Sequence, residues 1–190
     1  MAKINLNELF SEKPQVKYCC AKNCIELSAS NPEELYPELD LFVKFLGGEK
    51  RVMKWTAIRI IGNLSRVDSK NRIDKYVPEF IGMLDCKELI TAANAIAALA
   101  EIARSKQKYR DKILAELLKV ESKVFLNKGS ASSECRNIAI GHVITALAGF
   151  TDYIAENKKA VEFLERQSKN TRNAVKLKAE KLLSKVNKVK

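Results

Sequence analysis

The amino-acid sequence predicts an all-α fold: an α-α superhelix of about four to five helical hairpins, forming a single repeat domain over residues 1–190. Three observations lead to this fold class. Five short segments repeat one apolar pattern, helix-like segments lie between them, and the central copy is apolar around nearly its whole circumference. Stacked hairpins explain all three, because each hairpin completes its hydrophobic interior only against its neighbours.

The five repeated segments share two positions that lie four residues apart. The first position holds a small or branched residue: Ala21, Ala57, Ala95, Ala139 and Val175. The second holds an apolar residue: Ile25, Ile61, Leu99, Val143 and Ala179. Successive copies are separated by 36, 38, 44 and 36 residues. Because residues four apart share one face of an α-helix, the pattern predicts equivalent helices within 18–28, 54–65, 92–103, 135–148 and 171–183.

The central copy, LITAANAIAALAEIA over residues 89–103, contains Glu101 as its single charged residue. Its uncharged run covers residues 89–100, which is shorter than the roughly 20 apolar residues that a membrane-spanning helix needs. A helix that is apolar all round and rich in alanine is instead typical of the middle of a stack, where neighbours touch it on several sides. We therefore expect no membrane contact.

A second helix is expected between successive copies. Residues 31–48 begin with Asn31 as a helix cap and Pro32 at the first helical position, and end at Gly47 and Gly48. Residues 73–85, 109–126 and 154–167 occupy the same place in the following units. The last copy carries lysines on its outer face, which predicts a terminal cap. The longer 44-residue interval contains NKGSASS, residues 127–133, which we interpret as an extended turn with Ser133 capping the next helix; a binding loop or a serine modification site is the alternative.

The repeated segments resemble HEAT repeats, which belong to the armadillo-like α-solenoids. The similar stretches read AIRIIGNL at residues 57–64, AIAALAEI at 95–102 and RNIAIGHVITAL at 136–147. Pro37 and Pro78, inside the second helices, also suit the HEAT pattern. The resemblance covers about residues 14–190 and implies a right-handed α-solenoid of about four and a half helical pairs.

Other residue types point away from catalysis and cofactors. The five cysteines are an odd number without CxxC spacing, so we expect reduced structural thiols, no bound metal and a cytoplasmic location. His142 is the one histidine, and we interpret it as structural. The sequence contains no glycine-rich phosphate loop and no GxSxG motif. We therefore expect no enzyme activity, no cofactor and no small-molecule substrate.

Positive charge gives the strongest indication of function. The net charge is +11, and residues 169–190 hold eight basic residues against one glutamate. A second group of cations falls in the turns between paired helices, and stacking would align these turns along one edge. We call this predicted contact surface the turn ridge; it comprises Lys70, Arg72, Lys75, Lys106, Lys108, Arg110 and Lys112. An ordinary solvated lysine-rich surface is the competing interpretation.

The predicted function is that of a non-catalytic scaffold or adaptor. It would bind an acidic protein or peptide partner through the turn ridge and through a concave face, which we expect the second helices to form. The alternative is a nucleic-acid-binding protein, similar in architecture to HEAT-like DNA glycosylases, that uses the turn ridge and the basic C-terminal segment. Aromatic support for this alternative is small: Trp55 is expected to pack in the core, and Tyr36, Tyr76 and Tyr109 are the surface candidates.

Overall fold

The computed structural model describes residues 4–188. The helices that carry the five repeated segments, called the first helices below, are α1 (Pro14–Ser30), α4 (Arg51–Leu64), α6 (Leu89–Ser105), α8 (Ser133–Leu147) and α11 (Asn173–Val186). The second helices are α2 (Pro32–Leu35), α3 (Leu39–Leu46), α5 (Val77–Gly82), α7 (Gln107–Leu118), α9 (Thr151–Glu156) and α10 (Lys158–Gln167). All five predicted repeat helices are present.

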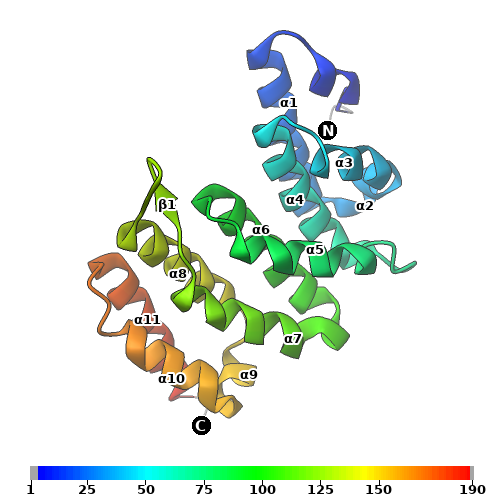
Figure 1. The fold of residues 1–190 in the computed structure, drawn as a ribbon. Helices are drawn as coiled ribbons and strands as arrows, with labels where there is room; N and C mark the ends of the chain where they lie inside the picture. Colours follow the sequence, from blue (N-terminus) through cyan, green and yellow to red (C-terminus); the bar gives the residue numbers. More distant parts are fainter. Residues whose placement is uncertain (1–3, 189–190) are drawn as a thin grey trace.

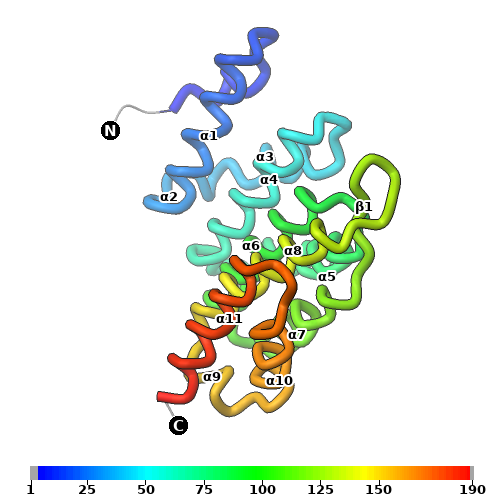
Figure 2. The backbone as a smooth tube through the Cα atoms, turned by 90° about the vertical axis from the view of Figure 1, so that its left-hand side faces the viewer, coloured from blue at the N-terminus to red at the C-terminus, as the bar shows by residue number. Residues whose placement is uncertain are grey.

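The helices form two layers, one of first helices and one of second helices. Both layers run side by side along a curved stack. Within the first layer α1 packs on α4, α4 on α6, α6 on α8 and α8 on α11. The second helices α3, α5, α7 and α10 form the other layer, and Figure 2 shows this layer along one side of the molecule. Figure 1 shows the same stack running from the N-terminal to the C-terminal repeat. The predicted fold class, an α-α superhelix, is confirmed.

The repeated positions lie in the hydrophobic core, as the sequence pattern requires. All five residues at the first position are at most 2% exposed, and at the second position only Ile25, near the N-terminal end of the stack, is partly exposed. Small residues beside these positions let α4 and α6 approach closely: a Cβ added to Gly62 of α4 would lie 2.5 Å from the Cα of Ala98 on α6. Bulkier side chains at this contact would force the two helices apart.

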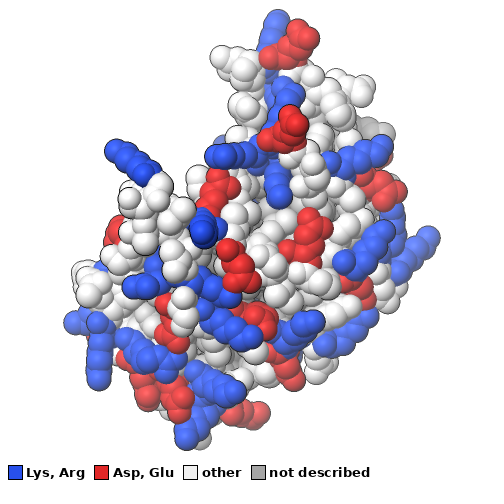
Figure 3. Space-filling view, in the orientation of Figure 1, with Lys and Arg blue, Asp and Glu red and all other residues white. Residues whose placement is uncertain are grey.

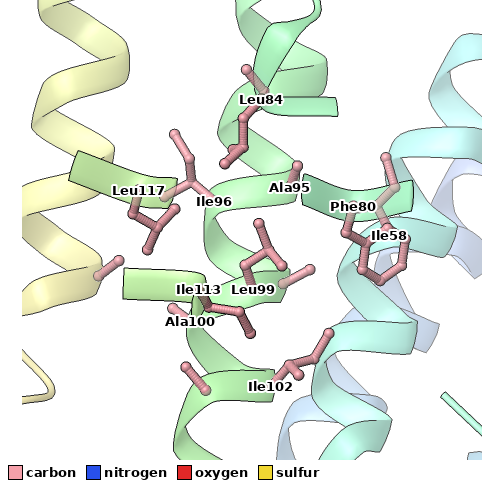
Figure 4. Close-up of a cluster of buried hydrophobic side chains, with 14 of the residues drawn as sticks. Ile58, Phe80, Leu84, Ala95, Ile96, Leu99, Ala100, Ile102, Ile113 and Leu117 are labelled. Carbon is pink, nitrogen blue, oxygen red and sulfur yellow. The ribbon is translucent and has the colours of Figure 1, made fainter. Parts of the chain in front are cut away.

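Helix α6 lies at the centre of this core. Figure 4 shows its side chain Leu99 with residues of the preceding repeat and of the paired helix α7 around it. These residues are Ile58 of α4, Phe80 of α5, and Ile113 and Leu117 of α7, all fully buried. Full burial of an aliphatic or aromatic side chain stabilises the fold by about 1.5–3 kcal/mol, so this cluster contributes much of the stability of the central repeats.

All four expected second helices are interrupted or shortened: in residues 73–85 only α5 is α-helical, and residues 154–167 are broken at Asn157 between α9 and α10. The segment 31–48 divides into α2, a 3₁₀ turn (Tyr36–Glu38) and α3, because Pro37 has no N–H to donate and its ring clashes with the preceding turn. The segment 109–126 leaves the α-helical conformation after Leu118 and continues as a 3₁₀ turn (Lys119–Ser122). Further 3₁₀ turns cover Leu6–Phe10, Ser65–Val67, Asp74–Tyr76 and Met83–Asp85.

The insertion between the third and fourth repeats is a small β-hairpin. Strands β1 (Leu126–Asn127) and β2 (Ser130–Ala131) pair antiparallel around Lys128 and Gly129, whose φ angles are +50° and +83°. Two consecutive positive φ values define the turn type that best matches strand twist. The helix cap that follows is Ser132, whose hydroxyl accepts a hydrogen bond from the Cys135 N–H. The expectation that Ser133 is the cap is therefore wrong by one residue.

Polar side chains add specific links between successive repeats. The Asn63 amide donates to the Ser28 hydroxyl at 2.9 Å in the buried space between α1 and α4. The Trp55 indole N–H donates to the Thr91 hydroxyl on α6, also at 2.9 Å, which gives this side chain the packing role predicted for it. Burying a polar group without a hydrogen-bond partner is unfavourable. Each of these hydrogen bonds therefore favours one relative position of the two helices that it joins.

Candidate functional site

Lys106, a predicted member of the turn ridge, is not available to a partner. Its side chain is only 6% exposed, and its Nζ lies 3.0 Å from Asp68 Oδ2 and 2.8 Å from Asp74 Oδ1. It also donates to the side-chain oxygen of Asn71 at 2.9 Å. Burial acts to lower the pKa of Lys106, but the carboxylates of Asp74 and Asp68 outweigh it and raise the pKa above its ordinary value. Lys106 is a structural cation, which corrects the expectation.

Asp68 is the centre of this buried ionic cluster and joins three repeats. Its carboxylate accepts hydrogen bonds from the Tyr36 hydroxyl at 2.5 Å and from the backbone N–H groups of Arg72 and Ile73, each at 2.9 Å. Burial acts to raise the pKa of Asp68, but these donors and Lys106 hold it below its ordinary value. Burial and the contact with Asp68 raise the pKa of Tyr36 to about 12. Tyr36 therefore serves packing rather than surface recognition.

Three other cations of the turn ridge are already engaged within the chain. Arg72 pairs with Asp40 at 2.7 Å, and Lys108 pairs with Asp74. The Arg110 guanidinium donates to the backbone carbonyl of Ala103 at 3.2 Å. These contacts are partly or fully exposed, so an acidic partner can compete for the three cations. Binding would then have to break the existing intramolecular contacts.

The remaining cations of the turn ridge are Lys70, Lys75 and Lys112. Each is exposed, and none has a carboxylate within ion-pair distance among residues 4–188. Figure 3 shows that on the face of the second helices Lys and Arg side chains are interspersed with Asp and Glu. The turn ridge thus has three accessible cations within a surface of mixed charge.

A more strongly positive surface lies on the face of the first helices. Three adjoining hollows of about 220, 110 and 230 Å³ cross α4, α6, α8 and α11. The first two share His142, the second and third share Lys178, and the first and third share Thr145. We call this continuous surface the groove. Its lining includes Arg59, Ala97, Ala100, Glu101, Arg104, Ile138, His142, Ile144, Thr145, Ala148, Arg172, Lys178, Lys181, Leu182 and Lys185.

Four cations of the groove have no carboxylate partner within the described part of the chain: Arg59, Lys178, Lys181 and Lys185. The other two cations are paired at the edges, Arg104 with Glu101 at 2.5 Å and Arg172 with Glu134 at 3.0 Å. Like charges that converge without counter-ions create a positive potential, which attracts acidic ligands. The groove is therefore a candidate anion-binding surface.

His142 lies where the first two hollows meet. Its side chain is exposed, and its ring makes no hydrogen bond to any residue in the range 4–188. Partial burial, Lys178 and Arg59 together lower its pKa, because the protonated ring would add a third positive charge beside them. The sequence analysis assigned His142 a structural role; the structure instead places it in the groove.

The second helices were expected to form the concave binding face, but the hollow between them is different in character. It has a volume of about 590 Å³ and lies between α7 and α10. Its cations alternate with carboxylates, and Glu121 pairs with Arg166 at 2.6 Å and accepts from Gln167 at 2.8 Å. The more strongly positive surface thus lies on the first helices, whereas the second helices present mixed charge around this hollow.

The sequence also contains a signal for the groove. Three residues after the repeated small position stand His142 and Lys178, and six residues after it stand Glu101, Thr145 and Lys181. Polar residues recur at these two offsets on α6, α8 and α11, which marks one polar stripe along the first layer.

No protein-family model matches the chain, and no curated protein matches it. Among solved structures it is similar to an engineered protein determined by the Northeast Structural Genomics Consortium, with a TM-score of 0.50, 15% identity and coverage of 96% of this chain and 95% of that one. A designed armadillo repeat protein is also similar, with a TM-score of 0.42, 16% identity and coverage of 95% and 98%. The chain has an armadillo/HEAT-like repeat fold. At such low identity the likeness extends to this repeat fold alone.

Within residues 4–188 of this repeat fold, no group of three or more His, Cys, Asp or Glu side chains is arranged to hold a metal ion. The five cysteines are free thiols, and burial raises the pKa of Cys24 to about 12, so this thiol stays protonated at neutral pH. Over the same residues, none of the helices combines the length and apolar character needed to span a bilayer.

Proposed function

We propose that the protein is a non-catalytic scaffold that binds an acidic segment of a protein partner in the groove. The observation that carries this proposal is that four cations lining the groove, Arg59 on α4 and Lys178, Lys181 and Lys185 on α11, have no carboxylate partner among residues 4–188. The exposed lysines of the turn ridge, Lys70, Lys75 and Lys112, form the competing site for the same segment. We place this function in the cytoplasm, where free thiols remain reduced.

The lining of the groove favours a protein segment over nucleic acid. Between its cations the surface is aliphatic, with Ile138, Ile144 and Leu182 and several alanines. Proteins that bind single strands stack bases on aromatic rings, and the three hollows are lined by no Phe, Tyr or Trp in the described part of the chain. An acidic segment with aliphatic residues complements both the charge and the apolar area.

A binding experiment with charge-reversed variants tests the proposal. Fluorescence anisotropy would follow a dye-labelled glutamate-rich peptide at low ionic strength, added to the wild type and to the Arg59→Glu/Lys178→Glu variant. We expect the groove variant to lose at least about tenfold in affinity, because a positive contact becomes a repulsive one. The matched control reverses two exposed lysines of the turn ridge, Lys70→Glu and Lys75→Glu. Loss of binding in this control but not in the groove variant would place the partner on the turn ridge and overturn the assignment to the groove.

Nucleic-acid binding is the second candidate, and one observation favours it: Lys178, Lys181 and Lys185 lie along a single face of α11. A helix face of this kind can follow a phosphate backbone. A salt titration with a short duplex and a single strand discriminates the two functions. Phosphate binding weakens steeply as salt rises, with a slope close to the number of lysines engaged. Undetectable binding of both probes at low salt would exclude this candidate.

A further inference from the structure

The hollow between α8 and α11 combines an apolar floor with a cationic rim. The floor consists of Ile144 from α8, Ala148 directly after the end of α8, and Leu182 from α11. Lys178, Lys181 and Lys185 stand around it on α11, and all three are exposed. Lysine side chains place their methylene stems along apolar surface and keep the charged end in water, so they extend the walls of the hollow as well as charging its edge.

One of these lysines is held in place. Lys178 Nζ donates to the Thr145 hydroxyl at 3.0 Å, and that hydroxyl itself donates to the Gly141 carbonyl at 2.9 Å. This contact connects α11 to α8 across the hollow and fixes one side of the rim before any ligand arrives. A fixed contact group loses less conformational entropy on binding than a free side chain does.

The size of the hollow limits what it can hold. Its volume of about 230 Å³ lies below the roughly 300–1,000 Å³ of small-molecule sites, and it is open to solvent. It suits one side chain inserted from a larger ligand. In protein interfaces such side chains, seated in a pocket and surrounded by weaker contacts, contribute most of the binding energy.

We propose that this hollow is the anchor pocket of the scaffold, which receives one aliphatic side chain of the partner while carboxylates on both sides of that residue pair with Lys178, Lys181 and Lys185. The inference rests on the proposed function and deepens it, because it specifies the partner as an acidic segment interrupted by an aliphatic residue. Charge complementarity selects this occupant: an aliphatic residue between basic residues would meet repulsion at the rim, and a purely acidic segment would leave the apolar floor uncovered.

Two labelled peptides with equal charge test the pocket. One contains Glu-Glu-Leu-Glu-Glu and the other Glu-Glu-Ser-Glu-Glu, each flanked by glycines, and fluorescence anisotropy measures both affinities for the full chain. We expect the leucine peptide to bind about tenfold more tightly, because the leucine side chain removes apolar surface from water in the pocket and the serine side chain does not. Methyl NMR of the unmodified protein should show intermolecular contacts between the peptide leucine and Ile144 and Leu182.

Filling the pocket supplies the matched variant. Ala148→Phe places a ring in the hollow, and we expect it to reduce the preference for leucine to less than twofold. Ala115→Phe, on the exposed side of α7, should leave the tenfold preference unchanged. Should Ala148→Phe fail to fold, the NMR contacts in the wild type decide the question. Equal affinities for the two peptides would overturn the anchor pocket and leave the proposed function standing, whereas failure of both peptides to bind would overturn both.

Discussion

The ammonium group of Lys106 lies 3.0 Å from the carboxylate of Asp68, and both side chains are almost completely buried. Asp68 follows α4, and Lys106 stands between α6 and α7, so the pair connects the second repeat to the third. Tyr36, which precedes α3, donates to the same carboxylate and brings the first repeat into the cluster. One ionic contact thus joins Asp68 and Lys106, which lie 38 residues apart in the sequence.

Replacing Lys106 with methionine should destabilise the protein by about 3–5 kcal/mol, because Asp68 and Asp74 would remain buried without their cation. Urea unfolding followed by circular dichroism measures this loss. Lys108→Met is the control: the Lys108 side chain is 55% exposed, and its pair with Asp74 should contribute no more than about 1 kcal/mol. A similar small change in both variants would contradict a structural role for Lys106.

The same cluster sets the response of stability to acid. Burial opposes ionisation, but hydrogen bonds and nearby lysines keep the pKa values of Asp68 and Asp74 below their ordinary value of 3.8. For a carboxyl group with a lowered pKa in the folded state, the stabilising contribution is present above the unfolded pKa and is lost as pH falls through the folded one. We therefore expect the free energy of unfolding to drop below about pH 4 and Asp68→Asn to flatten this part of the curve. Acid titrations of the two proteins with the same slope would show that other carboxyl groups are responsible.

The contact between Gly62 and Ala98 predicts opposite effects for two glycine substitutions. Gly62→Ala would place a methyl group 2.5 Å from the Ala98 backbone and should destabilise the protein by about 1–3 kcal/mol through overpacking of α4 against α6. A Cβ added at Gly82 of α5 meets no atom within 4 Å, so Gly82→Ala should be neutral or stabilise by up to about 1 kcal/mol. Thermal melts compare the two variants, and equal effects would show that α4 and α6 can separate without penalty.

Binding of an acidic peptide should be coupled to protonation of His142. Burial, Lys178 on α11 and Arg59 on α4 lower its pKa in the free protein. The other charged groups nearby are paired: Glu101 with Arg104 within α6, and Arg172, which precedes α11, with Glu134 on α8. A bound carboxylate would raise this pKa, so a proton is taken up on binding.

Affinity for the peptide should therefore increase as pH falls from about 7.5 to about 5.5, a range in which histidine gains a proton while glutamate stays ionised. Anisotropy titrations at several pH values measure this effect, and His142→Asn should bind with an affinity that is nearly constant over the range. An unchanged pH dependence in the variant would assign the proton to another group.

The sequence predicts the repeat core well because the physical requirement is local. A small residue at Ala57, Ala95 and Ala139 is what close packing of adjacent helices demands, and the helical period places it on the buried face wherever it occurs. The same reasoning predicted Pro32 at a helix start correctly. It did not predict the break at Pro37. The apolar pattern continues through this residue, but proline has no backbone N–H to donate to the preceding turn of an α-helix.

The candidate site was predicted less well because exposure depends on residues distant in the sequence. Lys106 reads as a surface lysine in a basic turn, and only its tertiary neighbours Asp68 and Asp74 make it a buried one. His142 stands in an apolar helix and reads as a core residue, but the curvature of the first layer leaves it exposed beside Lys178. Neither outcome follows from composition or periodicity.

The packing of each first helix on the next also gives the molecule a mechanical property. Because α4, α6, α8 and α11 form a one-dimensional series of contacts, a small rotation at each interface adds to the next, and the distance between the ends can change without breaking any single contact. The stack is therefore expected to behave as an elastic spring, and a ligand that grips two distant repeats would stiffen it.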